Sequence, residues 1–269
     1  MSLKQPTRLG PTAETLLIPL FARTMENRRK RPILADPKAA EMVEGIDWDF
    51  QQFNQRLRVV ACNLRSAMYD EWVAEFVRRN PHGTVVEIGA GLNLRFERLD
   101  NGTVHWFDLG LPDVVELRRK LFSDSERRRT LASSVLDAGW VAAVRQSPGP
   151  YFFVAEAVFV YLPEADVKAA LAQIARSFSG ASIALDTAAA RAVEGGDCAR
   201  MLPATKRPSK SVVEIVRPVT PRIPPPLCRN EFHRPARAWC RAHCDAPPDS
   251  RRRAQSTFRI RRRADTSGR

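Results

Sequence analysis

The sequence has no long hydrophobic run and no apolar stretch near its first residue. None of its apolar runs reaches the ~18 residues that a membrane-spanning helix needs. Residues 1–11 are polar, unlike a secretory signal peptide. These absences predict a cytoplasmic protein without a membrane-spanning segment. The 44% of apolar residues among 269 are still enough for a hydrophobic core.

Cysteine is scarce in most of the chain. Cys62 is the only cysteine before residue 198, and we interpret it as a small, buried hydrophobic residue within a helix. Three of the four later cysteines lie near two histidines, in the order Cys228, His233, Cys240, His243 and Cys244. That spacing matches no common structural zinc site, so the sequence predicts no metal site.

Acidic residues are depleted only in the C-terminal part of the chain. Residues 1–197 hold 25 basic and 25 acidic side chains, so the whole net charge of +13 lies in residues 198–269. This tail also holds half of the twenty prolines. Its arginine runs, 251–253 and 261–263, repel one another in a packed fold. We therefore expect a disordered or poorly packed tail.

Two interpretations of the tail differ in class. A basic tail binds nucleic acid or an acidic membrane through phosphate contacts, which gives the alternative hypothesis of a non-catalytic nucleic-acid-binding protein. We favour a shifted reading frame, because a GC-rich gene read out of frame yields Arg, Pro, Ala, Ser and Cys. On this hypothesis the C-terminal strands are missing or replaced, and the last regular strand has an unpaired edge.

Strands and helices alternate through the middle of the chain. Short β-branched or aromatic runs predict strands at 84–88, 103–108, 130–135, 151–155 and 182–186. Apolar residues at helical spacing predict helices at 12–27, 37–44, 49–79, 93–99, 112–122, 137–145 and 163–178, with Asp137 as the cap of the sixth. This order is typical of an α/β, Rossmann-like, doubly wound and mostly parallel sheet. We divide the chain into a helical N-terminal cap (1–80), this core (81–197) and the tail (198–269).

Polar residues mark the ends of the predicted strands. In open sheets of this kind, ligands bind outside the carboxyl ends of the strands. The residues there are Glu87, Asp108, Ser134, Glu156 and Asp186. We expect these side chains to converge on one site.

The first strand ends in an acid and a glycine turn, Glu87-Ile88-Gly89-Ala90-Gly91. Glycine lets the backbone pass close to a ligand. A dinucleotide fingerprint requires a small residue where Leu94 stands, which disfavours a nicotinamide enzyme. The acid instead favours a cationic ligand. S-adenosylmethionine has that chemistry, since it carries a sulfonium and an ammonium group and no phosphate.

Five stretches together resemble the leucine carboxyl methyltransferase family, in particular its bacterial branch related to polyketide O-methyltransferases. They are Arg65–Asp70, Val85–Arg95, Phe107–Val114, Ser134–Trp140 and Ala155–Leu162. The resemblance covers roughly residues 15–195. It implies an S-adenosylmethionine-dependent enzyme that methylates a carboxylate or hydroxyl of a small, polyketide-like molecule. A carboxylate acceptor is already ionised at pH 7 and needs no general base, and we assign no catalytic residue.

The resemblance also implies roles for individual residues. Arg65 would bind the methionine carboxylate of the cofactor, and Gly89 and Gly91 would contact the methionine part. Glu156 would lie near the ammonium and sulfonium groups, in a site that also includes Glu87. The remaining assignments are Ser134 and Val135 beside the adenine with Asp137 next to them, and Arg23 as a basic residue that closes over the cofactor.

One position departs from the family pattern. The acid that usually precedes the Leu-Pro of the second strand, and that binds the ribose hydroxyls, is replaced by Gly110. Asp108 lies two residues earlier, on the same side of an extended strand, and we assign it as a partial substitute. Two lost hydrogen bonds to a charged group weaken binding by about 2–4 kcal/mol. Gly110 and the tail together raise the hypothesis of a degraded, inactive copy.

Overall fold

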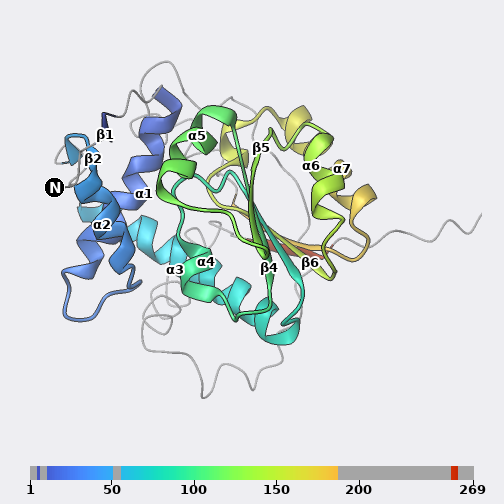
Figure 1. The fold of residues 1–269 in the computed structure, drawn as a ribbon, viewed down its shortest axis with the longest axis horizontal. Helices are drawn as coiled ribbons and strands as arrows, with labels where there is room; N and C mark the ends of the chain where they lie inside the picture. Colours follow the sequence, from blue (N-terminus) through green and yellow to red (C-terminus); the bar gives the residue numbers. More distant parts are fainter. Residues whose placement is uncertain (1–4, 7–10, 51–55, 187–255, 260–269) are drawn as a thin grey trace, which may run out of the picture.

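A six-stranded sheet forms the centre of the molecule (Figure 1). The computed structural model describes residues 5–6, 11–50, 56–186 and 256–259, and the side chains of residues 16–50 and 59–186. The strands lie in the order β5-β4-β3-β6-β7-β8. Their bounds are β3 Thr84–Ile88, β4 His105–Gly110, β5 Arg128–Ala132, β6 Tyr151–Ala155, β7 Ser182–Leu185 and β8 Ser256–Arg259. All neighbours are parallel except β7 and β8, so the predicted Rossmann-like, mostly parallel sheet is confirmed.

Helices cover both faces of the sheet because alternate residues of a buried strand point to opposite sides. One face packs Val86, Phe107 and Phe153 against α6 (Gly139–Val144) and α7 (Glu164–Ser177). The other face packs Val85 and Trp106 against the helices α3 (Arg56–Arg79) and α4 (Arg95–Leu99). Helix α5 (Pro112–Leu121) connects β4 to β5. The long N-terminal helix α3 is therefore part of the layer that covers the sheet.

The rest of the N-terminal cap packs beside this layer. It consists of β1 (Gln5–Pro6), α1 (Pro11–Asn27), α2 (Pro37–Gly45) and β2 (Ile46–Asp47). Helix α2 begins as predicted, with Asp36 as N-cap and Pro37 in the first turn. Residues of α1 and α2 share one apolar cluster with Leu92 and Leu94, which follow the glycine turn, and with Leu117 of α5. The cap is thus built directly onto the segment that carries the turn.

Some element bounds differ from the sequence predictions. Strand β4 extends two residues further, to Gly110, and β5 ends at Ala132 rather than at residue 135. The reason is a turn after β5, in which the Asp137 carboxylate accepts a hydrogen bond from Ser134 N (2.9 Å). The prediction that Asp137 caps the next helix is wrong, since α6 starts at Gly139 without a side-chain cap. A short 3₁₀ helix, Phe159–Tyr161, was not predicted.

The sheet does not end at the last predicted strand. Strand β8, from the C-terminal tail, pairs antiparallel with β7 from Ser182↔Arg259 to Leu185↔Ser256. The expected unpaired edge of the fifth predicted strand is therefore wrong. The other predictions for the tail, including its disorder and the absence of a zinc site, fall on residues 187–255 and 260–269, outside the described residues.

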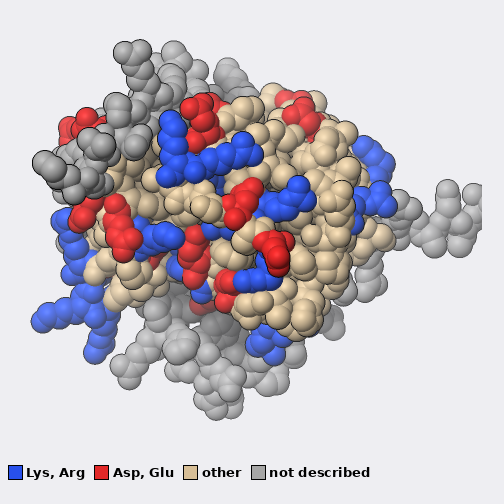
Figure 2. All heavy atoms as spheres, viewed as in Figure 1, with Lys and Arg blue, Asp and Glu red and all other residues tan. Residues whose placement is uncertain are grey.

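The described surface shows the balance of charge that residues 1–197 have in the sequence. Basic and acidic side chains are interspersed over the face shown in Figure 2. Among the described helices, none combines the length and the hydrophobicity needed to cross a membrane.

Substitution of Asp36 tests how the N-terminal cap is held against the rest of the fold. Its carboxylate caps α2 through Ala39 N (3.2 Å) and pairs with Arg23 Nε (2.9 Å) and Arg98 Nη1 (2.8 Å). Replacing Asp36 with alanine leaves two buried guanidinium groups without this partner, so we expect a loss of about 3–5 kcal/mol in the free energy of unfolding. Urea denaturation measures it. The exposed Glu41 on the same helix is the control, because Glu41→Ala should cost less than about 0.5 kcal/mol. Equal effects of the two variants would contradict the prediction.

Candidate functional site

Four carboxylates lie on the same face of the sheet, at the carboxyl ends of its strands. Each follows a buried apolar residue by two positions along its chain segment: Val85 and Glu87, Trp106 and Asp108, Val154 and Glu156, Ala184 and Asp186. Because side chains of a strand repeat every two residues, the acids continue the apolar face that α3 and α4 cover. Glu87 is the last residue but one of β3, and Glu156 directly follows β6, the adjacent strand at which the strand order of the sheet reverses. Such a switch point is where ligands bind in open α/β sheets.

Arg95 joins these acids. It begins helix α4 and is fully buried. Its Nε pairs with Asp70 Oδ1 of α3 (2.7 Å), its Nη2 with Glu156 Oε2 (2.7 Å), and its Nη1 with Glu87 Oε1. Each of the three nitrogens of the guanidinium group thus contacts a different carboxylate. The arginine fixes the ends of β3 and β6 relative to each other and to α3.

Glu156 is held ionised by its neighbours. Arg65 Nε donates to its Oε1 (3.0 Å), and Ser66 Oγ donates to the same oxygen (2.8 Å). Burial alone favours the protonated acid, but Arg65 and Arg95 outweigh it and lower the pKa of Glu156 to about 2. The predicted site residues Arg65 and Glu156 are therefore in direct contact, although 91 residues separate them.

The pKa of Glu87 is shifted in the opposite direction from that of Glu156. Its Oε1 accepts hydrogen bonds from Asn93 Nδ2 (2.7 Å) and Arg95, whereas its Oε2 is buried without a partner among the described residues. Burial raises the pKa of Glu87 to about 7, against the opposing effect of Arg95. One oxygen of this buried carboxylate is thus left without a hydrogen-bond donor from the described residues.

The glycine turn follows directly. Gly89 and Gly91 have φ of +63° and +51°, a region that side chains with a Cβ avoid. A Cβ at Gly89 would lie 2.5 Å from Val158 Cγ2, and one at Gly91 would lie 2.8 Å from Leu16 Cδ2 of α1. Both the backbone shape and the packing around the turn therefore require glycine.

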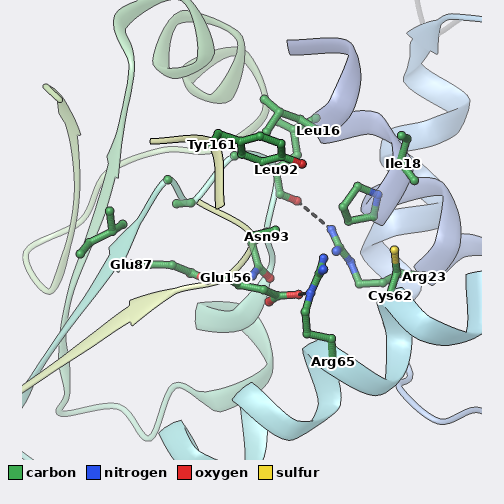
Figure 3. Close-up of a pocket in the computed structure, with 16 residues that line it drawn as sticks. Leu16, Ile18, Arg23, Cys62, Arg65, Glu87, Leu92, Asn93, Glu156 and Tyr161 are labelled. Carbon is green, nitrogen blue, oxygen red and sulfur yellow. Dashed lines mark hydrogen bonds and ion pairs between the residues drawn. The ribbon is translucent and has the colours of Figure 1, made fainter. Parts of the chain in front are cut away.

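A pocket opens between this turn and helix α1 (Figure 3). Its empty space, open solvent included, is about 920 Å³. The residues that line it are Leu16, Ile18, Pro19, Arg23, Cys62, Arg65, Glu87–Asn93, Glu156, Ala157 and Tyr161. Six of the predicted site residues meet there: Arg23, Arg65, Glu87, Gly89, Gly91 and Glu156.

Arg23 connects α1 to the turn. Its Nη2 donates to the carbonyl oxygen of Leu92 (2.9 Å), and its Nε pairs with Asp36 (2.9 Å). In Figure 3 its guanidinium group lies beside that of Arg65, and both point into the pocket. The two arginines give this wall of the pocket a positive charge, close to the acidic pair Glu87 and Glu156.

The other predicted site residues do not line this pocket. Asp108 is buried, with Oδ2 paired to Arg118 Nη2 (2.7 Å) and Arg128 Nε (2.8 Å) and Oδ1 bonded to Trp106 Nε1 (3.1 Å). Ser134, Val135 and Asp137 lie in and beside the turn after β5, at the far side of β4. The assignment of these four residues to the ribose and the adenine stays a prediction.

Three residues that line the pocket or contact Glu87 were not predicted from the sequence. Arg95 and Asn93 contact Glu87 from positions just after the glycine turn, and Tyr161 lines the pocket from the 3₁₀ helix. A buried arginine has no local signal, since a single basic residue in a short helix is typical of an exposed face. The proximity of Asn93 and Arg95 to the acid at the end of β3 was the only clue.

Comparisons with known proteins agree with this geometry. The family model described as leucine carboxyl methyltransferase matches residues 17–175. This chain belongs to the leucine carboxyl methyltransferase family. The tetracenomycin polyketide synthesis O-methyltransferase TcmP of Streptomyces glaucescens is 34% identical over 183 residues, which are 66% of this chain and 67% of that protein. The S-adenosyl-L-methionine-dependent methyltransferase dpfgK of Gibberella zeae is 25% identical over 199 residues, 67% of this chain and 66% of that one. The chain thus spans about two thirds of the length of these relatives.

Family membership confirms the prediction of an S-adenosylmethionine-dependent methyltransferase, and with it the cofactor. The residues present fit that cofactor: the glycine turn, Arg65 and Glu156 line one pocket, and Glu87 Oε2 has no partner in the described part of the chain. These comparisons give no support to the alternative of a nucleic-acid-binding protein.

The low pKa of Glu156 predicts a loss of stability in acid. Its folded pKa of about 2 lies below its ordinary value of 4.5, so the stabilisation is complete above pH 4.5 and is lost as the pH falls toward 2. The methyltransferase should lose about 3 kcal/mol over this range from Glu156 alone. Glu156→Gln should flatten the slope of unfolding free energy against pH between 5 and 3.5, measured by urea denaturation. Glu116→Gln, at an exposed site on α5, is the control; the same flattening there would refute the assignment to Glu156.

Replacing Gly110 with aspartate should increase the affinity of the site for S-adenosylhomocysteine. Its φ lies outside the positive region, and a Cβ there would lie 3.5 Å from Val115 Cγ2, which is ordinary contact. Gly110→Asp therefore fits and restores the acid that the family pattern has at this point. We expect it to tighten the binding of S-adenosylhomocysteine on the order of tenfold or more, measured by calorimetry. Gly110→Ala supplies the Cβ without the carboxylate and should leave the affinity unchanged; equal affinities of the two variants would contradict the ribose assignment.

Proposed function

We propose that this methyltransferase transfers the methyl group of S-adenosylmethionine to a carboxylate oxygen of a small, polyketide-like acid. Two facts support the type of acceptor. The relative at 34% identity is named as an O-methyltransferase of polyketide synthesis. The pocket wall formed by Leu16, Ile18, Pro19 and Tyr161 is apolar and aromatic, and Tyr161 is 45% exposed.

The observation that favours a carboxylate over a hydroxyl is the state of the acids in the pocket. A hydroxyl acceptor must lose its proton to a base, whereas a carboxylate is already ionised at pH 7. Of the described residues that line the pocket, only Glu87 and Glu156 are carboxylates. Glu156 has a pKa of about 2 and two arginine partners, so it is a poor proton acceptor, and Glu87 is buried beneath the turn with Asn93 and Arg95 on one oxygen.

The histidines of the described residues do not supply the base either. Two histidines lie in the described part of the chain, His82 and His105, and both are at the amino end of the strands. The pocket lies at the opposite, carboxyl end. Of the described acids and histidines, only Glu87 combines a place in the pocket lining with a pKa near 7, and its side chain is buried, so the pocket favours orientation of an acceptor over proton removal.

The chain's own residues would act mainly by positioning. S-adenosylmethionine, when bound, supplies the electrophilic methyl group. Arg23 and Arg65 point N–H donors into the pocket, where they would orient the carboxylates of the two reactants, and α1 covers the turn and excludes water. Orientation of two reactants in a closed site is sufficient for large rate enhancements when the nucleophile is already ionised.

The test compares two acceptors with one purified chain. Methyl-labelled S-adenosylmethionine is incubated with a polycyclic aromatic carboxylic acid that also carries phenol groups, and with the same compound lacking the carboxyl group. We expect label only in the acid, as a methyl ester that mild alkali cleaves. An alkali-stable product, which indicates a methyl ether, would contradict the carboxylate proposal. The absence of label in both compounds would contradict the proposed function as a whole.

A further inference from the structure

The ion pairs around the pocket form one connected network with unequal charge. Starting at the cap, Arg23 and Arg98 share Asp36; Arg98 and Arg95 share Asp70; Arg95 contacts Glu87 and Glu156; and Arg65 lies between Glu156 and Asp186. The described members are five carboxylates and four guanidinium groups. One negative charge therefore has no counterpart in the network.

Among the described residues, the neighbouring charges do not supply the missing cation. Arg118 and Asp108 face Glu87 from α5 and β4, and they pair with each other (2.7 Å). Arg128 pairs with Asp108 (2.8 Å) and with Glu97 (2.6 Å), so this second group also balances two acids with two arginines. Lys38 lies 4.0 Å from Glu97, with half of its side chain in solvent, at the end of that group away from the pocket.

The unbalanced charge can be located within the network. Glu156 and Asp70 each contact two arginines at 3.0 Å or less. Glu87 has a buried oxygen without a partner among the described residues. Asp186 approaches Arg65 only to 3.9 Å, and its two oxygens share the N–H group of Ala157 (2.8 and 3.0 Å from the nitrogen). Burial raises the pKa of Glu87 to about 7 and that of Asp186 to about 6. These two acids are the ones that hold a proton most readily.

The ligand that fits such a site carries one net positive charge. S-adenosylmethionine has a sulfonium, an ammonium and a carboxylate, whereas its product S-adenosylhomocysteine has lost the sulfonium charge and is neutral overall. We propose that the unbalanced carboxylate charge, centred on Glu87 with Asp186 as its second carrier, makes this site select the cationic cofactor over the neutral product. When no cation is bound, a proton occupies the site instead.

The charge of the ligand then decides whether binding releases a proton. Binding of the cofactor to the protonated site releases the proton to solvent, so that one positive charge replaces another. Binding of the neutral product leaves the proton in place. The inference rests on the cofactor and is independent of the acceptor proposed above, so failure of the acceptor test does not affect it.

Calorimetry of the full chain with the two ligands tests the exchange. Each ligand is titrated at pH 6.5 in buffers with different ionisation enthalpies, and the dependence of the measured heat on that enthalpy gives the number of protons released. We expect a substantial fraction of one proton with S-adenosylmethionine and close to none with S-adenosylhomocysteine. Equal proton numbers for the two ligands, or no binding of either, would overturn the proposal.

The wild-type protein also provides a test without substitution. Between pH 5.5 and 8, affinity for S-adenosylmethionine should rise with pH as the acids ionise, by up to about tenfold per pH unit for one proton. Affinity for S-adenosylhomocysteine should change much less. Parallel curves for the two ligands would contradict the selection by charge, even if Glu87 variants fail to fold.

Glu87→Gln separates charge from position, because the amide keeps the shape of the side chain. We expect it to abolish the proton release and to weaken S-adenosylmethionine on the order of tenfold more than S-adenosylhomocysteine. Equal weakening of both ligands would mean that Glu87 acts only through position, against the proposal. Glu97→Gln, in the second charge group and outside the pocket lining, should leave both the proton number and the ratio of affinities unchanged.

Discussion

The contact of one buried arginine with three carboxylates determines the arrangement of the site. Arg95 is inaccessible to solvent, so each of its three nitrogens requires a partner within the protein. Those partners come from α3, β3 and β6. Desolvation offsets most of the attraction in such buried pairs, so they add little net stability, but the loss of one partner is costly. The network therefore acts as a geometric constraint, which fixes where the strand ends and helix α3 meet.

The sheet and the site depend on the same two-residue repeat. Val85, Trp106, Val154 and Ala184 fill the space under α3 and α4. The next residues of the same parity are acids, at the edge where the sheet meets the pocket. A strand that shifted by one residue would bury its acid on the wrong face and expose its apolar residues. Correct register of the core and correct placement of the acids are thus one requirement.

Much of the fold could be predicted from the sequence because its signals are local. Strands β3 and β6 have the predicted bounds, since each is an apolar run bounded by glycine or proline. The register between strands decided the rest: β4 extends to Gly110 because it pairs there with Ala132 of β5. Strand β8 could not be predicted, since its partner β7 lies about seventy positions earlier in the chain and its composition is that of the basic tail.

Part of the site could also be predicted, because some of its signals are local in the sequence. Glu87, Gly89 and Gly91 form a contiguous motif, Glu156 follows a predicted strand, and only Arg23 and Arg65 depended on the family resemblance; all six line the pocket. Arg95 contacts Asp70 and Glu156, which lie far away in the sequence, and no spacing reveals these contacts, whereas Asp186 was expected at the site from its position at the end of the fifth predicted strand. The packing of Leu16 of α1 on Gly91, within an apolar cluster that includes Leu92 and Leu94, has a further consequence. The glycine turn has no stable shape of its own without that cluster, so the smallest unit of this chain able to fold around a cofactor includes its N-terminal helices together with the sheet.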